Sequence, residues 1–420
     1  MEEILKDLNE EQREAVTYGE GPLLIIAGAG TGKTRVITRR IAWLINSGRA
    51  KTGEILALTF TDKAALEMEE RVDVLVPYGY TDIWISTFHA FGDRILRENA
   101  IEIGLKPDFR VLTRPEAAVF FRENLYKFNL SYYRPLSDPT HFIGAMIDFF
   151  SRVRDEDVSP EEYIAYSLKL TEQAKQNPDD AALQEEALKQ REIAYAYRTY
   201  QELLMKESKV DFANQFYLAL QLLRQHPLVL KRYQEQFKYI LVDEFQDTNF
   251  AQFQLLKLLG GMRKNITVVA DDDQCVFRFR GAAYSNIINF DREYPQAKKI
   301  SLIQNYRSPQ SILDCAYRLI QKNNPERFEV KANINKRLIG LRKEGKPPVH
   351  MRFDTFSSEA DSVARIIKEK VEKEGYSYSD FCILVRSNSD ADPFLRSLNM
   401  LSIPLLSNYA DLHLYINHFT

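Results

Sequence analysis

A glycine-rich octapeptide near the N-terminus has the residue types needed to surround a polyphosphate. It reads Ala27-Gly28-Ala29-Gly30-Thr31-Gly32-Lys33-Thr34. Glycines let successive backbone N–H groups converge on phosphate oxygens, and a following helix adds its positive dipole. Lys33 supplies a mobile charge for β- and γ-phosphates, and Thr34 offers a hydroxyl to Mg²⁺. The segment Gly28–Thr34 therefore predicts a nucleoside-triphosphate site, and a glycine turn without a ligand is the alternative.

A second motif places two acids directly after an apolar run, in the order Ile240-Leu241-Val242-Asp243-Glu244. In phosphate-loop enzymes an acid at such a strand end holds Mg²⁺, and its neighbour can orient the attacking water. We assign Asp243 to the metal and Glu244 to the general base. Acids after a strand also occur in solvated loops, so the pair gains its meaning from the phosphate loop.

Both motifs need a scaffold that presents strand ends side by side. Short apolar runs bounded by turns occur at Leu23–Ile26, Ile55–Phe60, Ile83–Ser86, Tyr239–Val242 and Ile266–Val269. Polar loops or helical patterns such as Arg35–Asn46 follow them. Buried strands that alternate with helices are typical of an α/β domain with a parallel sheet.

The alternation of strands and helices stops in the middle of the chain. Residues 99–236 are rich in Glu, Lys, Gln, Tyr and Leu and favour helices, with a loop expected at Thr171–Asp180. After residue 299, Val349–Phe353 and Phe381–Val385 are strand-like, and Ser357–Glu374 between them is helical. We therefore expect a helical insertion, followed by the opening of a second α/β domain.

Composition describes a globular protein and gives no sign of a membrane span or a zinc site. The 420 residues are 45% hydrophobic and 27% charged, with a net charge of −3, so no overall basicity indicates a nucleic-acid partner. Cys275, Cys315 and Cys382 lack metal-ligand spacing, which argues against zinc and disulfides and favours a reducing cytosol. No apolar run approaches the ~20 residues that span a bilayer. We expect a cytoplasmic protein, or a nuclear one if its source has a nucleus, with no membrane partner.

The acidic motif extends into a sequence that resembles a known family. Asp243-Glu244-Phe245-Gln246-Asp247-Thr248 resembles motif II of the UvrD/Rep/PcrA branch of superfamily 1 helicases. Further motifs of that family appear in order: Leu8-Asn9 with Gln12, Thr59-Phe60-Thr61 with Lys63, Ser86-Thr87-Phe88-His89, Asp271-Asp272-Asp273-Gln274 through Phe277-Arg278-Phe279-Arg280, and Asn305-Tyr306-Arg307-Ser308. Together they cover the chain from about residue 5 to 400.

The resemblance implies an α/β fold built around a RecA-like phosphate-loop NTPase domain with a parallel sheet. We expect its first part at residues 1–98, a helical inserted domain at 99–236, its second part at 237–298, and a partial second RecA-like domain at 299–420.

The resemblance also implies roles on the ATP side of the motor. Gln12 and Arg35 would contact adenine, and Tyr306 would stack on the ring. Gln274 would sense the γ-phosphate, and Arg307 would stabilise its charge during transfer. A core aromatic is the alternative for Tyr306, and a surface ion pair is the alternative for Arg307. The expected cofactors are ATP and Mg²⁺.

On the DNA side, the resemblance implies contacts that tolerate any base sequence. Phe60, His89 and Phe279 would stack bases or line the strand. Thr59, Lys63, Thr87, Arg278 and Arg280 would bind phosphates. Phenylalanines near strand ends are often core residues, and that is the alternative here.

The resulting hypothesis is an ATP-dependent helicase that moves 3′ to 5′ on single-stranded DNA and acts at single-strand/double-strand junctions. The motor part of a helicase-nuclease and a non-catalytic, ATP-responsive DNA-binding module are the alternatives. The family's later motifs, a GLEF-type segment and an arginine-containing motif VI, are not found before Thr420. We therefore expect the chain to bind ATP·Mg²⁺ and DNA, to hydrolyse ATP slowly and not to unwind duplexes. Protein partners in repair or replication are not identified by the sequence.

Overall fold

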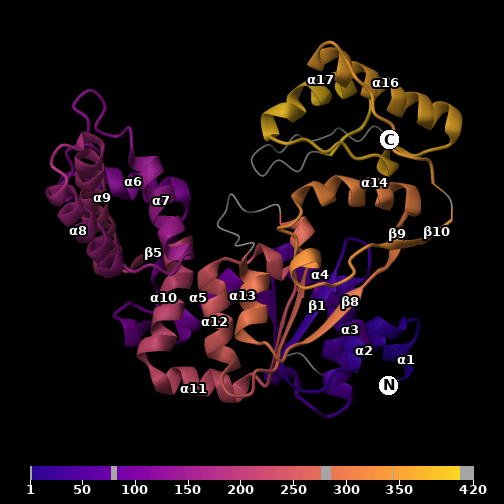
Figure 1. Ribbon diagram of the computed structural model, residues 1–420, viewed down its shortest axis with the longest axis horizontal. Helices are drawn as coiled ribbons and strands as arrows, with labels where there is room; N and C mark the ends of the chain where they lie inside the picture. Colours follow the sequence, from indigo (N-terminus) through magenta and orange to yellow (C-terminus); the bar gives the residue numbers. More distant parts are fainter. Residues whose placement is uncertain (1, 77–82, 276–284, 344, 407–420) are drawn as a thin grey trace. The chain divides into compact units, whose positions relative to one another are not determined.

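Six parallel strands form the central sheet of the computed structural model, which describes residues 2–76, 83–275, 285–343 and 345–406 (Figure 1). The strands are β1 (Leu23–Ala27), β2 (Ile55–Thr59), β3 (Trp84–Thr87), β6 (Tyr239–Val242), β7 (Ile266–Ala270) and β8 (Lys298–Leu302). They lie in the order β3-β2-β6-β7-β1-β8. The predicted parallel sheet is confirmed, and all five predicted apolar runs supply strands.

Helices cover both faces of this sheet, which explains why the strand sequences are continuously apolar. Alternate residues of β1 enter two different cores: Leu24 and Ile26 belong to one, and Leu23, Ile25 and Ala27 to the other. The second core includes α1 (Glu2–Leu5), α2 (Glu10–Thr17), α3 (Lys33–Asn46) and α4 (Asp62–Leu75). The first includes α5 (Phe88–Glu98), α10 (Phe212–Gln225), α11 (Pro227–Gln236), α12 (Phe250–Gly260) and α13 (Ser285–Glu293).

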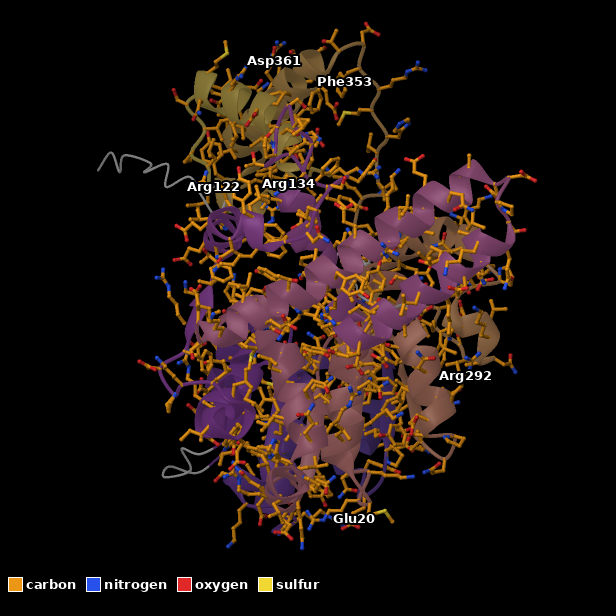
Figure 2. The ribbon with its side chains drawn as sticks, turned by 90° about the vertical axis from the view of Figure 1, so that its left-hand side faces the viewer. Glu20, Arg122, Arg134, Arg292, Phe353 and Asp361 are labelled. Atoms are coloured by element: carbon orange, nitrogen blue, oxygen red, sulfur yellow. The ribbon has the colours of Figure 1, made fainter. Side chains whose placement is uncertain are left out.

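Charged side chains occupy the outside of these layers. Glu20 in the turn before β1 and Arg292 in the last turn of α13 are exposed (Figure 2). No helix in the described part of the chain has the length and apolar character needed to cross a bilayer. Cys275, Cys315 and Cys382 form no disulfide with one another.

The central part of the chain has a helical core of its own, with buried residues from Leu112 to Leu204. Its helices are α6 (Arg114–Glu123), α7 (Ile143–Asp155), α8 (Pro160–Gln176) and α9 (Ala181–Lys206). A short parallel pair of β4 (Arg110–Leu112) and β5 (Lys209–Asp211) joins its two ends. Residues of α10 and α11, at the end of the predicted range 99–236, belong to the core on the sheet and not to the helical core. We retain 99–236 as the proposed insertion, and its own core extends from Leu112 to Leu204.

The loop predicted at Thr171–Asp180 is wrong over its first six residues, because α8 continues to Gln176. Glu, Gln and Lys are good helix formers, and an exposed helix face needs no apolar residues.

A buried ion pair joins α7 of the helical core to β5: Arg154 of α7 donates to Asp211, the last residue of β5, at 2.9 Å.

The first compact unit of the chain contains the main sheet and also the residues that follow it, up to Lys346. It contains the parallel pair β9 (Gln304–Pro309) and β10 (Ile339–Arg342), with α14 (Gln310–Ile320) and α15 (Phe328–Lys331) between them.

The second unit, from Pro347 onward, contains α16 (Phe356–Glu374) and α17 (Asp392–Met400). On α16, Asp361 accepts a hydrogen bond from the Ser397 hydroxyl of α17 at 2.7 Å (Figure 2). The predicted helix is confirmed, but the strands predicted at Val349–Phe353 and Phe381–Val385 are wrong. Neither segment pairs with a strand among the described residues, and Leu384 is 90% exposed.

Asp155 connects the helical core to the sheet and makes stability depend on pH. It accepts a hydrogen bond from Asn249, the N-cap of α12, at 2.7 Å. Burial, reinforced by the neighbouring Glu156, raises the pKa of Asp155 to about 7. An unfolded aspartate has a pKa of about 3.9, so the folded state alone keeps this proton between about pH 4 and 7. The contribution of Asp155 to stability therefore falls as pH rises through that window.

We predict that Asp155→Asn, which keeps an acceptor oxygen without a charge, melts with the wild type near pH 4. At pH 8 it should be more stable than the wild type by up to about 4 kcal/mol, because about 1.4 kcal/mol accompanies each of the roughly three pH units between the two pKa values. Melting followed by circular dichroism across this range tests the difference. Asp179→Asn, in an exposed loop, is the control. A parallel pH profile for Asp155→Asn and wild type contradicts the assignment.

Candidate nucleoside-triphosphate site

The glycine-rich turn lies between the carboxyl end of β1 and the start of α3. Gly30 and Gly32 adopt φ angles of 77° and 89°, which glycine tolerates at little cost. The Thr31 hydroxyl donates to the Gly28 carbonyl at 2.8 Å and closes the turn. Gly32 precedes α3 without a capping side chain, so the first-turn N–H groups of α3 can serve an anion.

Lys33 contacts two other predicted catalytic residues, Glu244 and Gln274. Its Nζ donates to Glu244 Oε2 at 2.7 Å and lies 3.5 Å from Gln274 Oε1. Lys33 belongs to the start of α3, Glu244 follows β6, and Gln274 follows β7. Because parallel strands end at one edge of a sheet, side chains more than 200 residues apart in sequence meet here.

Asp243 and Thr34 form an oxygen-rich pair beside Lys33. The Thr34 hydroxyl donates to Asp243, and the backbone N–H of Glu244 donates to Asp243 Oδ1 at 2.9 Å. Burial, followed by repulsion from Glu244, raises the pKa of Asp243 to about 6, against the opposing charge of Lys33. A carboxylate and a hydroxyl are hard oxygen donors, so these residues fit Mg²⁺.

The backbone at Glu244 is in a conformation that few non-glycine residues adopt. Its φ is 50° and its ψ is 44°, in the left-handed region. Such a conformation costs on the order of 1–3 kcal/mol and persists only where the surroundings hold it. It turns the chain sharply at the end of β6, where Asp243 and Glu244 leave the strand in succession.

Gln246 is a site residue to which the sequence analysis gave no role. Its Nε2 donates to Glu244 Oε2 at 2.6 Å, and its Oε1 accepts from the Asp271 backbone N–H at 3.0 Å. The buried amide therefore holds the proposed general base and ties it to the strand end of β7. Its position within the acidic motif was the only signal for it in the sequence.

The neighbouring Asp247 is also buried. Desolvation, followed by the charge of Glu244, raises the pKa of Asp247 to about 6, and Lys33 opposes the shift. Its Oδ1 has no hydrogen-bond partner among the described residues. A buried carboxylate oxygen of this kind is an additional acceptor at the site.

The predicted adenine residues lie on the other side of the glycine turn. Gln12 is fully buried, and its Nε2 donates to the Thr31 carbonyl at 2.9 Å. Asn9 Nδ2 donates to the Tyr306 hydroxyl at 3.2 Å, which in turn donates to Gln304 Oε1 at 3.4 Å. Tyr306 is 40% exposed and is therefore not a core aromatic. Arg35 is half-exposed in the first turn of α3.

A pocket of about 520 Å³ opens beside this group. Its lining residues are Leu8, Asn9, Glu10, Glu11, Arg13 and Gln304. Two of them, Asn9 and Gln304, hydrogen-bond to the Tyr306 hydroxyl, so the pocket adjoins the aromatic ring proposed to stack on a base.

A segment from β9 closes over the glycine turn. Asn305 Nδ2 donates to the Ala29 carbonyl at 2.5 Å, and the Tyr306 N–H donates to the Gly30 carbonyl at 2.9 Å. Asn305 Oδ1 accepts from the Arg307 N–H at 2.9 Å. The Arg307 side chain is exposed, and no described carboxylate pairs with it, which does not favour the surface ion-pair alternative.

Three consecutive acids after β7 could in principle hold a metal, since ligand atoms of Asp271, Asp272 and Asp273 lie within 4.8 Å of one another. The Lys336 ammonium bonds to all three, at 2.7 Å for Asp271 and 2.8 Å for Asp273. A cation of the protein itself therefore occupies the centre of the group. Lys336 carries no motif signal and was missed in the sequence.

The predicted DNA residues gather at the carboxyl ends of β2 and β3, where Thr59 and Thr87 are register partners. Both threonines are buried, and the Thr87 hydroxyl caps α5 by accepting from the Ala90 N–H. Phe60 is partly buried and Lys63 is exposed. Arg278, Phe279 and Arg280 lie outside the described residues.

His89 is the aromatic member of this group with clear neighbours. Its ring lies 6.5 Å from that of Phe212 and 6.3 Å from that of Phe216, both at steep angles. Although the residue retains exposed surface, desolvation lowers the pKa of His89, and the charge of Asp62 opposes the shift. The imidazole is therefore neutral at pH 7 and suited to stacking.

Comparisons with known proteins found two family models and a set of curated relatives that match this chain. The family model described as "UvrD/REP helicase N-terminal domain" matches residues 8–295, and "UvrD-like helicase C-terminal domain" matches residues 300–412. A relative named ATP-dependent DNA helicase PcrA, from Leuconostoc citreum, is 37% identical over 405 residues, covering 96% of this chain and 50% of the relative. The proteins of the same name from Staphylococcus epidermidis and Staphylococcus aureus are 36% and 38% identical, over 96% and 93% of this chain and 51% and 49% of their own lengths. The chain thus spans about half the length of these curated relatives.

The contact between the glycine turn and β9 predicts the effect of one methyl group. A Cβ at Gly30 would lie 2.6 Å from Arg307 Cβ and 2.8 Å from Asn305 Nδ2. Gly48 has a similar φ of 71°, but nothing lies within 4 Å of its Cβ position. We expect Gly30→Ala to displace the 305–307 segment and weaken ATPγS binding by about tenfold or more, a loss of about 1.4 kcal/mol. Gly48→Ala shares the backbone strain and should bind like the wild type in fluorescence titration. Equal affinities for the two variants would contradict the role of this contact.

Proposed function

Because the chain belongs to the UvrD/Rep helicase family, we propose that it is the ATP-hydrolysing motor part of a DNA helicase. The name of its relatives, ATP-dependent DNA helicase PcrA, supports ATP as the substrate and DNA as the partner. The observation that carries the proposal is the meeting of Lys33, Glu244 and Gln274, within 3.5 Å, beside the Thr34–Asp243 pair.

The residues support in-line hydrolysis at the γ-phosphorus. Lys33 is bonded to Glu244, and the γ-phosphate would compete for the same ammonium. Once Lys33 turns to the phosphate, Glu244 keeps its hydrogen bond from Gln246 and can accept a proton from water. The water oxygen then bonds to the γ-phosphorus, the bond to the bridging oxygen breaks, and that oxygen leaves on ADP. The proton lost by water goes to Glu244.

Thr34 and Asp243 would hold Mg²⁺, which when bound would supply positive charge to the phosphates. The chain's own residues supply the remaining stabilisation. The first-turn N–H groups of α3 and Lys33 bind the phosphates, and Gln274 faces the γ-phosphate position. Arg307, exposed after Asn305, would supply a further positive charge to the transferring group.

The DNA side of the proposal rests on the group of Phe60, His89 and Lys63 beside the carboxyl ends of β2 and β3. A neutral imidazole and a phenyl ring can stack on any base, and an exposed lysine can bind a phosphate. The 3′-to-5′ polarity, the preference for junctions and the cytoplasmic location stay predictions.

We predict that Lys33→Ala lowers the rate of ATP hydrolysis by about 10²–10³-fold, because it removes a donor aimed at the transferring charge. Single-turnover hydrolysis of radiolabelled ATP, with and without oligo(dT), measures the rate. Lys231→Ala removes an exposed lysine of α11 and serves as the matched control.

Stimulation of wild-type hydrolysis by oligo(dT), lost in Lys33→Ala and kept in Lys231→Ala, is the expected pattern. If wild type and Lys33→Ala hydrolyse ATP at the same rate while both bind DNA, the chain is a non-catalytic DNA-binding module and the proposal fails.

Substitution of His89 separates stacking from charge. We expect His89→Ala to weaken oligo(dT) binding by about 1–3 kcal/mol, and His89→Phe to retain it, because a neutral ring is what the site supplies. Fluorescence anisotropy measures both affinities, and His141→Ala, an exposed histidine of the helical region, is the control. An equal loss in the Phe and Ala variants would exclude stacking at this position.

A further inference from the structure

The segment between α14 and β10 places two buried cations on the acids that follow β7. Arg327, 3% exposed, donates to Asp273 at 2.8 and 2.6 Å through two nitrogens. Lys336, 7% exposed, directs its ammonium to Asp271, Asp272 and Asp273. The three N–H donors of a lysine are thereby all used. The segment is bound to the acids by charge as well as by hydrogen bonds.

Asp271 connects Lys336 to the nucleotide site, because it bonds to both Lys336 and Gln274. One of its oxygens, Oδ1, accepts from Lys336, and the other, Oδ2, accepts from Gln274 Nε2 at 2.5 Å. The amide of Gln274 is therefore oriented with its nitrogen toward Asp271. Its oxygen consequently faces Lys33, at 3.5 Å. Rotation of the amide by 180° would break the bond to Asp271 and place two oxygens together.

The same segment also reaches the glycine turn. Leu338, two residues after Lys336, lies 2.9 Å from the Cβ position of Gly28. Gln310 of α14 donates to the Leu338 carbonyl at 3.3 Å, so this stretch is fixed to the β9–β10 region as well. A displacement of residues 327–338 would change both the glycine turn and the acids after β7.

Because Asp271 and Asp272 are buried, removal of Lys336 would leave their negative charges without their main compensating cation. Proximity to the three carboxylates raises the pKa of Lys336 despite its desolvation, so the ammonium is charged at all physiological pH values. Without it, Asp271 would keep a buried negative charge and would turn toward another donor or take up a proton. In either event the acceptor that orients Gln274 changes.

We propose that Lys336 is a positioning residue that acts through Asp271 to orient Gln274 toward the γ-phosphate, and so couples the 327–338 segment to recognition of ATP over ADP. This inference rests on the proposed function, because it takes Gln274 as the γ-phosphate contact. Lys336 itself touches neither phosphate nor water in this scheme.

The test compares the affinities for ATPγS·Mg²⁺ and ADP·Mg²⁺, measured by displacement of a fluorescent nucleotide. We expect Lys336→Met to lower the ratio of ATPγS to ADP affinity by about tenfold, with ADP affinity nearly unchanged. Gln274→Ala should lower the ratio to the same extent, and the double variant should lose no more than either single variant. A merely structural role would weaken both nucleotides together.

The neighbouring Arg337 provides the matched control. Its side chain is 61% exposed and forms a surface ion pair with Asp314, so Arg337→Met removes a cation one residue away without touching Asp271. If Lys336→Met does not fold, as judged by circular dichroism, Asp271→Asn removes the same link by a nearly isosteric change and takes its place in the cycle.

The outcomes separate the inference from the function on which it rests. An unchanged ratio in folded Lys336→Met or Asp271→Asn, or losses that add to that of Gln274→Ala, overturns the inference while wild-type nucleotide binding keeps the function intact. If wild type binds neither nucleotide, or binds both as Lys33→Ala does, the proposed function fails and the inference fails with it.

Discussion

The parallel pairing of β6, β7 and β1 is the constraint on which the rest of the site depends. Leu241, Thr267 and Leu23 are register partners across these strands, and all three strands end at the same edge of the sheet. The glycine turn and both acidic segments leave the sheet from these ends. Successive residues point to opposite faces of a sheet, so a slip of one residue in β6 would turn each of its side chains from one core to the other. It would also carry Asp243 and Glu244 away from Lys33.

Two lysines stabilise acids at this edge, and their surroundings give them different roles. Among the described residues Lys33 pairs with one carboxylate, and it follows a glycine turn, so a phosphate can replace that partner. Lys336 pairs with three described carboxylates and is almost completely buried, so an incoming anion has little access to it. Gln274 lies between the two, bonded to Asp271 and near Lys33. The buried charge of Lys336, acting through Asp271, thus orients the Gln274 amide beside Lys33, whose ammonium can move to a phosphate.

The sequence predicted those parts of the molecule that depend on local pattern. The apolar runs identified all but one strand of the sheet, because parallel strands buried on both faces have a distinctive composition. Lys33, Glu244 and Gln274 were recognisable because motifs carry them. Gln246 and Lys336 were not, because their importance arises from partners distant in sequence, and a buried lysine has no local signature.

The errors have similar causes. The end of α8 was misjudged because a polar run reads alike in a loop and on an exposed helix face. Val349–Phe353 was read as a strand because alternation indicates the tendency to extend but not the presence of a neighbour to pair with. Strand pairing is a property of two segments, and only one of them is visible in a local pattern.

The edge strand β8 has a consequence for how the chain can be divided. The two family matches meet between residues 295 and 300, yet β8 begins at Lys298 and pairs with β1 along its whole length. A chain cut at that junction would leave β1, all five of whose residues are buried, as an open edge able to pair with another copy. The segment that is inherited as one family domain is therefore not the segment that folds as one body. The boundary between the two family models thus lies at the start of a strand that completes the first sheet.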